Sequence, residues 1–159
     1  EAILGRQEAD AEALAREYRE ILGDGNFFLE IQDHGIPEQR AANEVLRRIG
    51  KRTGLELVAT NDCHYLRKSD AFAHDVLLCI GTQRVLSDPD RMKYASEEFY
   101  LKNADEMYRI FPEDARAIEN TLRIAEMCNL EIKTGDFHLP EFPVPAGASL
   151  QAYFESVAW

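Results

Sequence analysis

The first sixty residues alternate between helical and extended segments, and this alternation constrains the fold more than any other feature. Residues 7–22 carry apolar side chains at helical spacing and end in a glycine-rich turn. Two apolar runs, 27–31 and 55–60, have the length of short buried strands, and a helix from about Gly35 to Gly54 separates them. Strands separated by a helix of this length indicate a parallel sheet with a crossover connection, so the expected fold class is α/β.

The pattern changes to mainly helical beyond the second strand. Ser69-Asp70 predicts the start of a helix over 69–81, followed by a polar loop over 82–96 and a short extended piece at 99–101. Asn103 is expected to cap a helix over 104–111. The apolar face expected for the helix before the loop consists of Ala73, Val76, Leu77 and Ile80.

Another helix and a proline-rich stretch are expected in the rest of the chain. The helix begins at Pro112 or its neighbour and ends at Asn129. Three prolines within 137–145 exclude regular structure there, and Ser149 is expected to cap a last helix. The inward positions expected for the helix before the prolines are Ala117, Ile118, Leu122 and Ala125.

Composition bounds the class of protein. A chain of 159 residues has the size of one domain, and no apolar run approaches the length of a membrane span. The net charge of −11 repels the phosphate backbone, so these residues are not expected to bind nucleic acid by themselves. Three widely spaced cysteines do not form a disulfide framework and suit a reducing cytoplasm. The first residue is Glu1 rather than Met, and the sequence stops inside its last helix, so we expect a piece of a longer protein.

Both expected strands end in side chains that can bind a metal ion. His34 follows the first strand, and Asp62 and His64 follow the second. Asp62 and His64 are two residues apart, so in an extended chain they point to the same side. A carboxylate with an imidazole suits a divalent ion such as Zn²⁺ or Mn²⁺. The residues alone leave two interpretations open, since side chains in these positions are either metal ligands or solvated loop residues.

Three neighbours of these candidates have weaker signals. Asp33 precedes His34 and is a candidate partner that orients its imidazole. Glu30 is a second candidate partner, because it points opposite to Ile31 along the strand. Cys63 lies between the two later candidates and is expected to be a core thiol.

The stretch LVATNDCHYL at 57–66 resembles the late metal-binding motif of PHP domains in bacterial DNA polymerase III alpha subunits. The stretch FLEIQDHG at 28–35 is similar to the same family, as is AHDVLLCI at 73–80. Further matches, in the family's order, are FYLK at 99–102, IENT at 118–121 and HLPEFP at 138–143. The ordered set, which spans about Gly25 to Pro145, makes the resemblance specific.

The resemblance implies the later part of a PHP-type distorted (β/α) barrel over 1–135, followed by a mainly helical segment over 136–159 that begins a polymerase palm region. It also implies that His34, Asp62 and His64 are ligands of divalent metal ions. In the family such ions activate water and clamp a phosphoester, and an intact site is linked to 3′–5′ exonuclease proofreading.

The parent protein implied is a replicative DNA-directed DNA polymerase, a cytoplasmic nucleotidyltransferase with no membrane part. It would bind DNA, nucleoside triphosphates and other replisome subunits, with Mg²⁺ in its palm. The family's opening His-x-His pair, its intermediate ligands and its palm carboxylates are not in this sequence, so these residues alone are expected to be inactive.

Two alternatives to this hypothesis stay open. In the first, the segment is a structural PHP module with vestigial ligands that braces the polymerase or binds a proofreading subunit. In the second, it belongs to a free-standing PHP phosphatase that acts on a small phosphomonoester. The extension over 87–145 disfavours the phosphatase, because a small phosphatase does not need it.

Overall fold

The computed structural model describes residues 3, 5, 7–137, 139–140 and 142–159. It divides the chain into two compact units, Glu1–Cys128 and Asn129–Trp159, and each is described by itself. His138 and Glu141, which belong to the last matching stretch, lie outside the described residues. Among the described residues, no helix has the length and apolar character needed to cross a membrane.

The first unit confirms the predicted alternation of helices and strands. Its elements in order are α1 (Glu8–Leu22), β1 (Leu29–Ile31), α2 (Pro37–Thr53) and β2 (Leu57–Ala59). The two strands pair in parallel, with Leu29 opposite Leu57 and Ile31 opposite Ala59. The described residues contain this two-stranded sheet and no larger one, so the α/β class is confirmed, whereas a barrel stays a prediction.

Glycine ends the crossover helix where the sequence predicted. Gly54 has φ 74° and ψ 10°, the left-handed conformation that a residue with a Cβ adopts at a cost. Its backbone N–H donates to the backbone oxygen of Gly50 at 2.9 Å. This left-handed glycine cap ends α2 and redirects the chain into β2, which starts beside β1.

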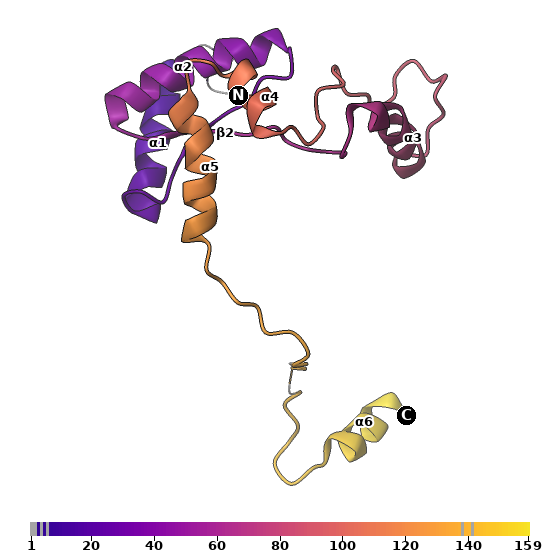
Figure 1. Ribbon diagram of the computed structural model, residues 1–159. Coiled ribbons are helices and arrows are strands. Elements are labelled where there is room, and N and C mark those ends of the chain that lie inside the picture. The colour runs from indigo at the N-terminus through magenta and orange to yellow at the C-terminus, as the bar shows by residue number, and fades with distance from the viewer. Residues whose placement is uncertain (1–2, 4, 6, 138, 141) are drawn as a thin grey trace. The chain divides into compact units, whose positions relative to one another are not determined.

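The core of this unit forms between the sheet and helices α1, α2 and α5 (Ala115–Met127), which lie around the strands in Figure 1. One buried cluster consists of Ile31, Ala59, Phe111, Ala117 and Ile118. The other consists of Ala15, Leu29, Ile49 and Leu55. Parallel strands are stable when helices cover them and exclude water. The packing of these helices against the sheet fixes where the ends of the two strands reach the surface.

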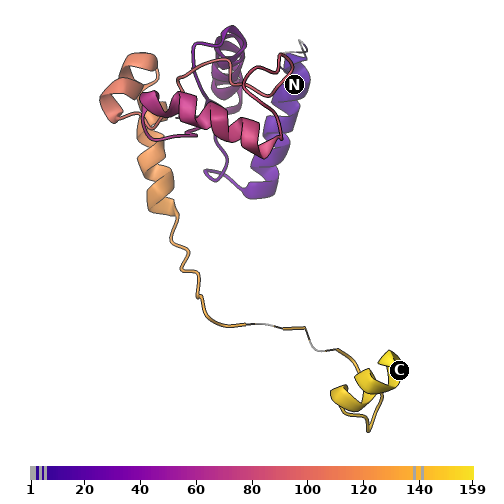
Figure 2. The same ribbon diagram turned by 90° about the vertical axis from the view of Figure 1, so that its right-hand side faces the viewer.

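The region after the sheet is helical as predicted, with one loop. A single 3₁₀ turn, η1 (Lys68–Asp70), leads into α3 (Ala71–Gly81), and α4 (Ala104–Ile110) follows the irregular segment that can be traced in Figure 2. Asn103 caps α4 as expected, since its Oδ1 accepts from the backbone N–H of Glu106 at 3.0 Å. Helix α5 starts at Ala115, three residues after the expected Pro112, because a turn intervenes.

Five positions that the sequence assigned to the apolar faces of α3 and α5 are exposed, namely Ala73, Leu77, Ile80, Leu122 and Ala125. Leu77 and Ile80 of α3 are 63% and 68% exposed, and Leu122 of α5 is 65% exposed. In α5 the predicted Ala117 and Ile118 are buried, whereas Ala125 is exposed. Helical periodicity identifies an apolar face, but it does not say whether a neighbouring element covers that face.

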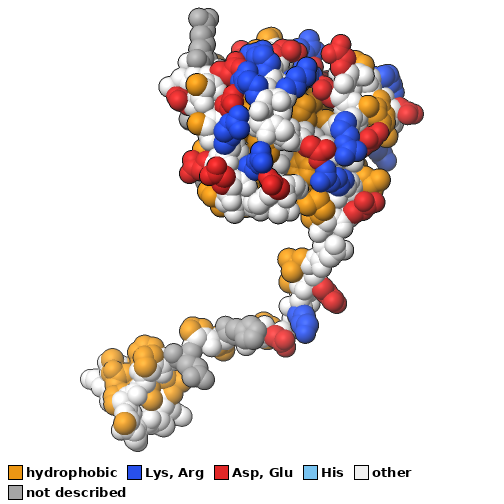
Figure 3. Space-filling view, turned by 90° about the vertical axis from the view of Figure 1, so that its left-hand side faces the viewer, with side chains coloured by type: hydrophobic (Ala, Val, Ile, Leu, Met, Phe, Trp, Pro, Cys, Tyr) orange, Lys and Arg blue, Asp and Glu red, His pale blue; other side chains and the backbone are white. Residues whose placement is uncertain are grey.

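The second unit contains one helix, α6 (Leu150–Ala158), within the described residues. Ser149 caps it as predicted, because its Oγ accepts from the backbone N–H of Ala152 at 3.2 Å. Figure 3 shows that apolar side chains gather over the end of this unit that contains α6, whereas acidic and basic side chains alternate over the visible face of the first unit. The exposed apolar side chains of α6 include Leu150, Phe154 and Val157.

Candidate metal site

The carboxyl end of β2 places Asp62 and His64 side by side. The Oδ2 atom of Asp62 lies 3.4 Å from Nε2 of His64. The Asp62 side chain is 50% exposed and that of His64 is 32% exposed, so both are open to solvent. Asp62 has φ 41°, in the left-handed region that aspartate tolerates better than most residues with a side chain. The carboxylate and the imidazole therefore lie together, although the backbone at Asp62 is turned and not extended as the sequence prediction assumed.

A segment from much later in the chain fixes the backbone of this pair. Asn61 is 7% exposed, and its Nδ2 donates to the backbone oxygens of Glu98 at 2.9 Å and Tyr100 at 2.7 Å. The backbone N–H of His64 donates to the backbone oxygen of Phe99 at 2.8 Å. Since each bond joins residues more than 30 positions apart, the pair depends on tertiary structure as well as on its own motif.

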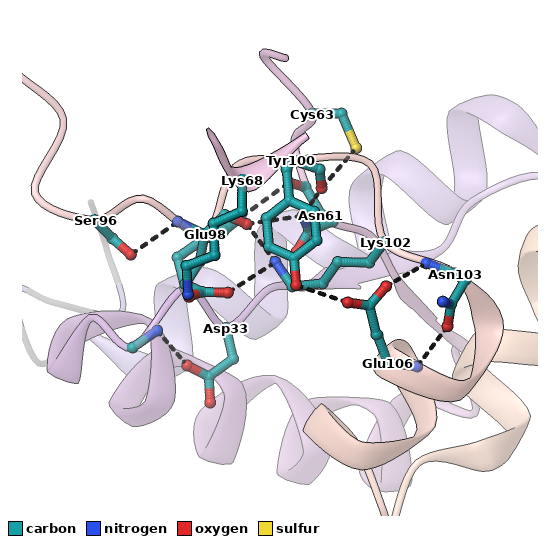
Figure 4. A network of polar contacts seen from close by, with 12 residues as sticks. Asp33, Asn61, Cys63, Lys68, Ser96, Glu98, Tyr100, Lys102, Asn103 and Glu106 are labelled. Atoms are coloured by element: carbon teal, nitrogen blue, oxygen red, sulfur yellow. Dashed lines mark hydrogen bonds and ion pairs between the residues drawn. The ribbon is translucent and has the colours of Figure 1, made fainter. Parts of the chain in front are cut away.

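A network of charged and polar side chains anchors the segment that contains Glu98 (Figure 4). Glu98 forms ion pairs with Lys68 and with the nearly buried Lys102, whose side chain is 2% exposed. The hydrogen bond from Lys68, together with that from Lys102, holds the pKa of Glu98 below its ordinary value. Tyr100 donates through its hydroxyl to Oε1 of Glu106 at 2.8 Å, which raises the Tyr100 pKa. The segment is thereby tied to η1 and α4.

The His34 side chain is buried, and both of its ring nitrogens have protein partners. It is 1% exposed, and its Nε2 donates to the backbone oxygen of Asn61 at 3.0 Å. Its Nδ1 then accepts from Nε2 of Gln39 at 2.8 Å, and Phe99 stacks on the ring at 3.9 Å between centroids. Because both ring nitrogens are bonded, this conformation of His34 offers no lone pair to a metal ion.

Asp33 and Glu30 have other partners than the proposed ligands. Asp33 accepts from the backbone N–H of Gly35 at 2.8 Å and pairs with Arg40 at 2.8 Å. Glu30 is exposed, as its alternation with buried Ile31 predicts, and accepts from the hydroxyl of Thr60 at 2.5 Å. Their supporting roles at a metal site stay predictions.

Cys63, which was expected in the core, is exposed instead. Its Sγ lies 3.6 Å from the backbone oxygen of Tyr100. The chain leaves the sheet before residue 63, so strand alternation no longer decides which side chains are buried.

Three aromatic rings near His64 were not identified as site residues from the sequence. The Tyr94 hydroxyl lies 3.1 Å from Nε2 and 3.3 Å from Nδ1 of His64. The rings of His74 and Phe99 lie 5.5 Å and 5.7 Å from the His64 ring, between centroids. Tyr94 comes from the loop after α3, where no periodicity or spacing marks it.

The donor set present fits a divalent cation in part. Asp62 and His64 supply one oxygen and one nitrogen, a combination that Zn²⁺ and Mn²⁺ accept. In the described part of the chain, no three His, Cys, Asp or Glu side chains lie close enough to hold an ion together. A complete coordination shell at this pair therefore needs ligands from water, from substrate or from further protein residues.

Comparison with known proteins identifies relatives of this sequence. No family model matches the chain. The chain is 44% identical over 154 residues to DNA polymerase III subunit alpha of Deinococcus radiodurans, which is 93% of this chain and 12% of that protein. It is 42% identical over 155 residues to that of Thermus aquaticus (94% and 13%), and 40% identical over 158 residues to that of Pseudomonas fluorescens (99% and 13%). The chain spans about an eighth of the length of these relatives and is related in sequence to one segment of DNA polymerase III alpha subunits.

Proposed function

We propose that these residues form part of the alpha subunit of a replicative, cytoplasmic DNA polymerase and carry part of a PHP-type phosphoesterase site. The whole protein would extend DNA from nucleoside triphosphates with Mg²⁺ in a palm outside these residues. It would work with other replisome subunits. Residues 1–135 would belong to the PHP domain and 136–159 to the start of the palm region.

The relationship to polymerase alpha subunits over 93% of the chain carries the first part of this proposal. The 3.4 Å approach of Asp62 to His64 at the end of a parallel strand carries the second part. In parallel α/β folds, ligands gather at the carboxyl ends of the strands, and both residues follow such an end. The change from one compact unit to the next after Cys128 lies close to the proposed boundary at 135.

The chemistry proposed is metal-assisted hydrolysis of a phosphodiester, as in a 3′–5′ exonuclease. A bound divalent ion would lower the pKa of a water ligand and neutralise charge on the phosphate. Asp62 would supply a negative oxygen and His64 a neutral nitrogen to that ion. The partial exposure of both side chains leaves room for water and a strand end to approach.

A second candidate function is a structural module in which the site is vestigial. The hydrogen bonding of His34 favours the structural module, since both ring nitrogens already have protein partners. In that case the segment would brace the polymerase or bind a separate proofreading subunit. The names of the relatives give no support to a free-standing phosphatase.

The metal content of the full-length polypeptide distinguishes these candidates. We would measure it by elemental mass spectrometry in the wild type and in variants with Asp62→Ala and His64→Ala, after dialysis against Zn²⁺ and Mn²⁺. His74→Ala is the matched control, because it removes a neighbouring imidazole and leaves the pair intact. Metal that is lost with the pair and kept in the control supports the site. A wild type without metal supports the structural module.

A further inference from the structure

A phenol group from the loop after α3 lies beside the His64 imidazole. The Tyr94 hydroxyl lies 3.1 Å from Nε2 and 3.3 Å from Nδ1 of the imidazole, so it can bond either nitrogen after a small rotation of the ring. Asp62 approaches the same imidazole at Nε2. The two neighbours therefore decide which nitrogen of His64 is free.

The Tyr94 ring has little freedom to move away. It packs edge-on against Phe99 at 4.7 Å and against His74 at 5.1 Å between centroids. Phe99 is 5% exposed and its backbone oxygen already bonds the His64 backbone. The hydroxyl is thus presented to His64 by a packed aromatic cluster.

An ion pair anchors the loop that carries this tyrosine. Arg91, whose side chain is 8% exposed, donates to the two carboxylate oxygens of Asp75 in α3 at 2.5 Å and 2.7 Å. Arg91 also donates to the backbone oxygen of Leu86 within the loop at 3.2 Å. This bidentate ion pair restrains the loop three residues before Tyr94.

We propose that Tyr94 is the positioning residue for His64 and accepts a hydrogen bond from Nδ1–H. With the proton held on Nδ1, the lone pair of Nε2 lies on the side of Asp62 and is available to a divalent cation. Metal-binding histidines generally donate their other ring N–H to such a partner, which fixes both the tautomer and the ring orientation. This assignment rests on the proposed metal site.

The test compares Tyr94→Phe with Tyr65→Phe in the full-length polypeptide. Tyr94→Phe keeps the packed ring and removes the hydroxyl. Tyr65→Phe removes the hydroxyl of a second tyrosine whose ring also contacts His74. The affinity for Zn²⁺ alone is measured by competition with a chromophoric chelator. Tyr94→Phe is expected to weaken it by about 10-fold, the usual effect of losing an outer hydrogen-bond partner.

A second measurement does not need metal. Acylation of each histidine by diethyl pyrocarbonate, followed by peptide mass spectrometry in metal-free protein, reports the reactivity of the ring nitrogen that carries the lone pair. In Tyr94→Phe, His64 is expected to react at least about twofold more slowly, because a hydrogen bond from Nδ1–H raises the basicity of the free Nε2 atom and the variant loses that bond. The rates of buried His34 and of His74 are expected to stay unchanged.

The outcomes separate this inference from the proposed function. Weaker Zn²⁺ binding and slower His64 acylation in Tyr94→Phe, with neither in Tyr65→Phe, support it. Unchanged or tighter Zn²⁺ binding in Tyr94→Phe overturns it, as does an equal effect in both variants. If the wild type binds no Zn²⁺, the proposed function fails, and the acylation rates alone decide whether Tyr94 bonds His64.

Discussion

Asn120 of α5 donates through Nδ2 to the backbone oxygen of Leu57 in β2 at 2.8 Å, across 63 positions of sequence. The Leu29 backbone N–H bonds the oxygen of Glu56, so the Leu57 oxygen points to the opposite edge of β2. A helix side chain thus satisfies a strand carbonyl on the edge that β1 does not use. Asn120 is fully buried, and its Oδ1 accepts no hydrogen bond from the described residues.

We expect Asn120→Ala to destabilise the first unit by about 1–3 kcal/mol, because it leaves a buried carbonyl without a donor. Urea unfolding followed by circular dichroism measures the change in the free energy of unfolding. Glu119→Ala, at a neighbouring exposed position of the same helix, is the control and should change stability by less than about 0.5 kcal/mol. Equal stability of the two variants would show that the Asn120 bond contributes nothing.

The ion pair between Arg47 of α2 and Asp114 before α5 gives a second prediction. The Arg47 Nη2 atom lies 2.6 Å from Oδ2 of Asp114, whose side chain is 8% exposed. The hydrogen bonds that Arg47 donates to Asp114 raise the pKa of Arg47. We expect Asp114→Asn to cost about 1.5–3 kcal/mol, the range for hydrogen bonds to charged groups.

Glu44 provides a control that uses the same arginine. Its carboxylate contacts Nη1 of Arg47 at 2.5 Å but is 66% exposed. Because water screens such a pair, Glu44→Gln should cost at most about 1 kcal/mol. Chemical denaturation of both variants tests the ranking, and a larger loss in Glu44→Gln would contradict it.

The order of helices and strands in the first unit was predictable because each depends on nearby residues. Gly54 ends α2, and the side chains of Asn103 and Ser149 cap α4 and α6 through contacts within three residues. The parallel pairing of the strands also followed, since a crossover helix of 17 residues separates them.

What could not be predicted depends on contacts between distant segments. Asp62 and His64 are two positions apart, so their pairing is visible in the sequence. The contact of Tyr94 with His64 joins residues 30 positions apart. His34 was identified as a candidate ligand, but its partners Gln39 and the Asn61 oxygen are set by the tertiary fold. A histidine after a strand gives no local sign of whether its nitrogens are free.

The contact between α1 and α2 predicts a dependence of stability on pH. Hydrogen bonds from Arg48 and Arg52 lower the pKa of Glu8 from its ordinary 4.5 to about 2. A carboxylate with a depressed pKa stabilises the folded state fully above its unfolded value, and this contribution is lost as pH falls through the folded value. The window therefore runs from about pH 4.5 down to about pH 2.

Thermal melts of the wild type and of Glu8→Gln across that window measure the effect. The wild type should lose its advantage over the variant as the pH falls, and the difference should shrink in high salt because the groups are exposed. A constant difference in melting temperature between about pH 6 and about pH 2 would exclude a linked Glu8 titration.

The last prediction concerns Lys102, whose side chain is 2% exposed. Its ammonium donates to the backbone oxygen of Glu98, lies 3.2 Å from the Glu98 carboxylate and sits 3.9 Å from the Tyr100 ring centroid. Lys102→Met keeps the apolar length of the side chain and removes these contacts. The segment that accepts the His64 backbone N–H should then open more often.

Hydrogen–deuterium exchange of the peptide around His64 measures that opening. Loss of about 1.4 kcal/mol of local stability corresponds to roughly tenfold faster exchange. Lys93→Met is the matched control, because Lys93 is exposed and forms no hydrogen bond or ion pair with the described residues. Faster exchange in Lys102→Met alone would show that a buried lysine outside the Asp62–His64 pair maintains the backbone of that pair. Equal exchange in the two variants would assign that role to Asn61 and Lys68.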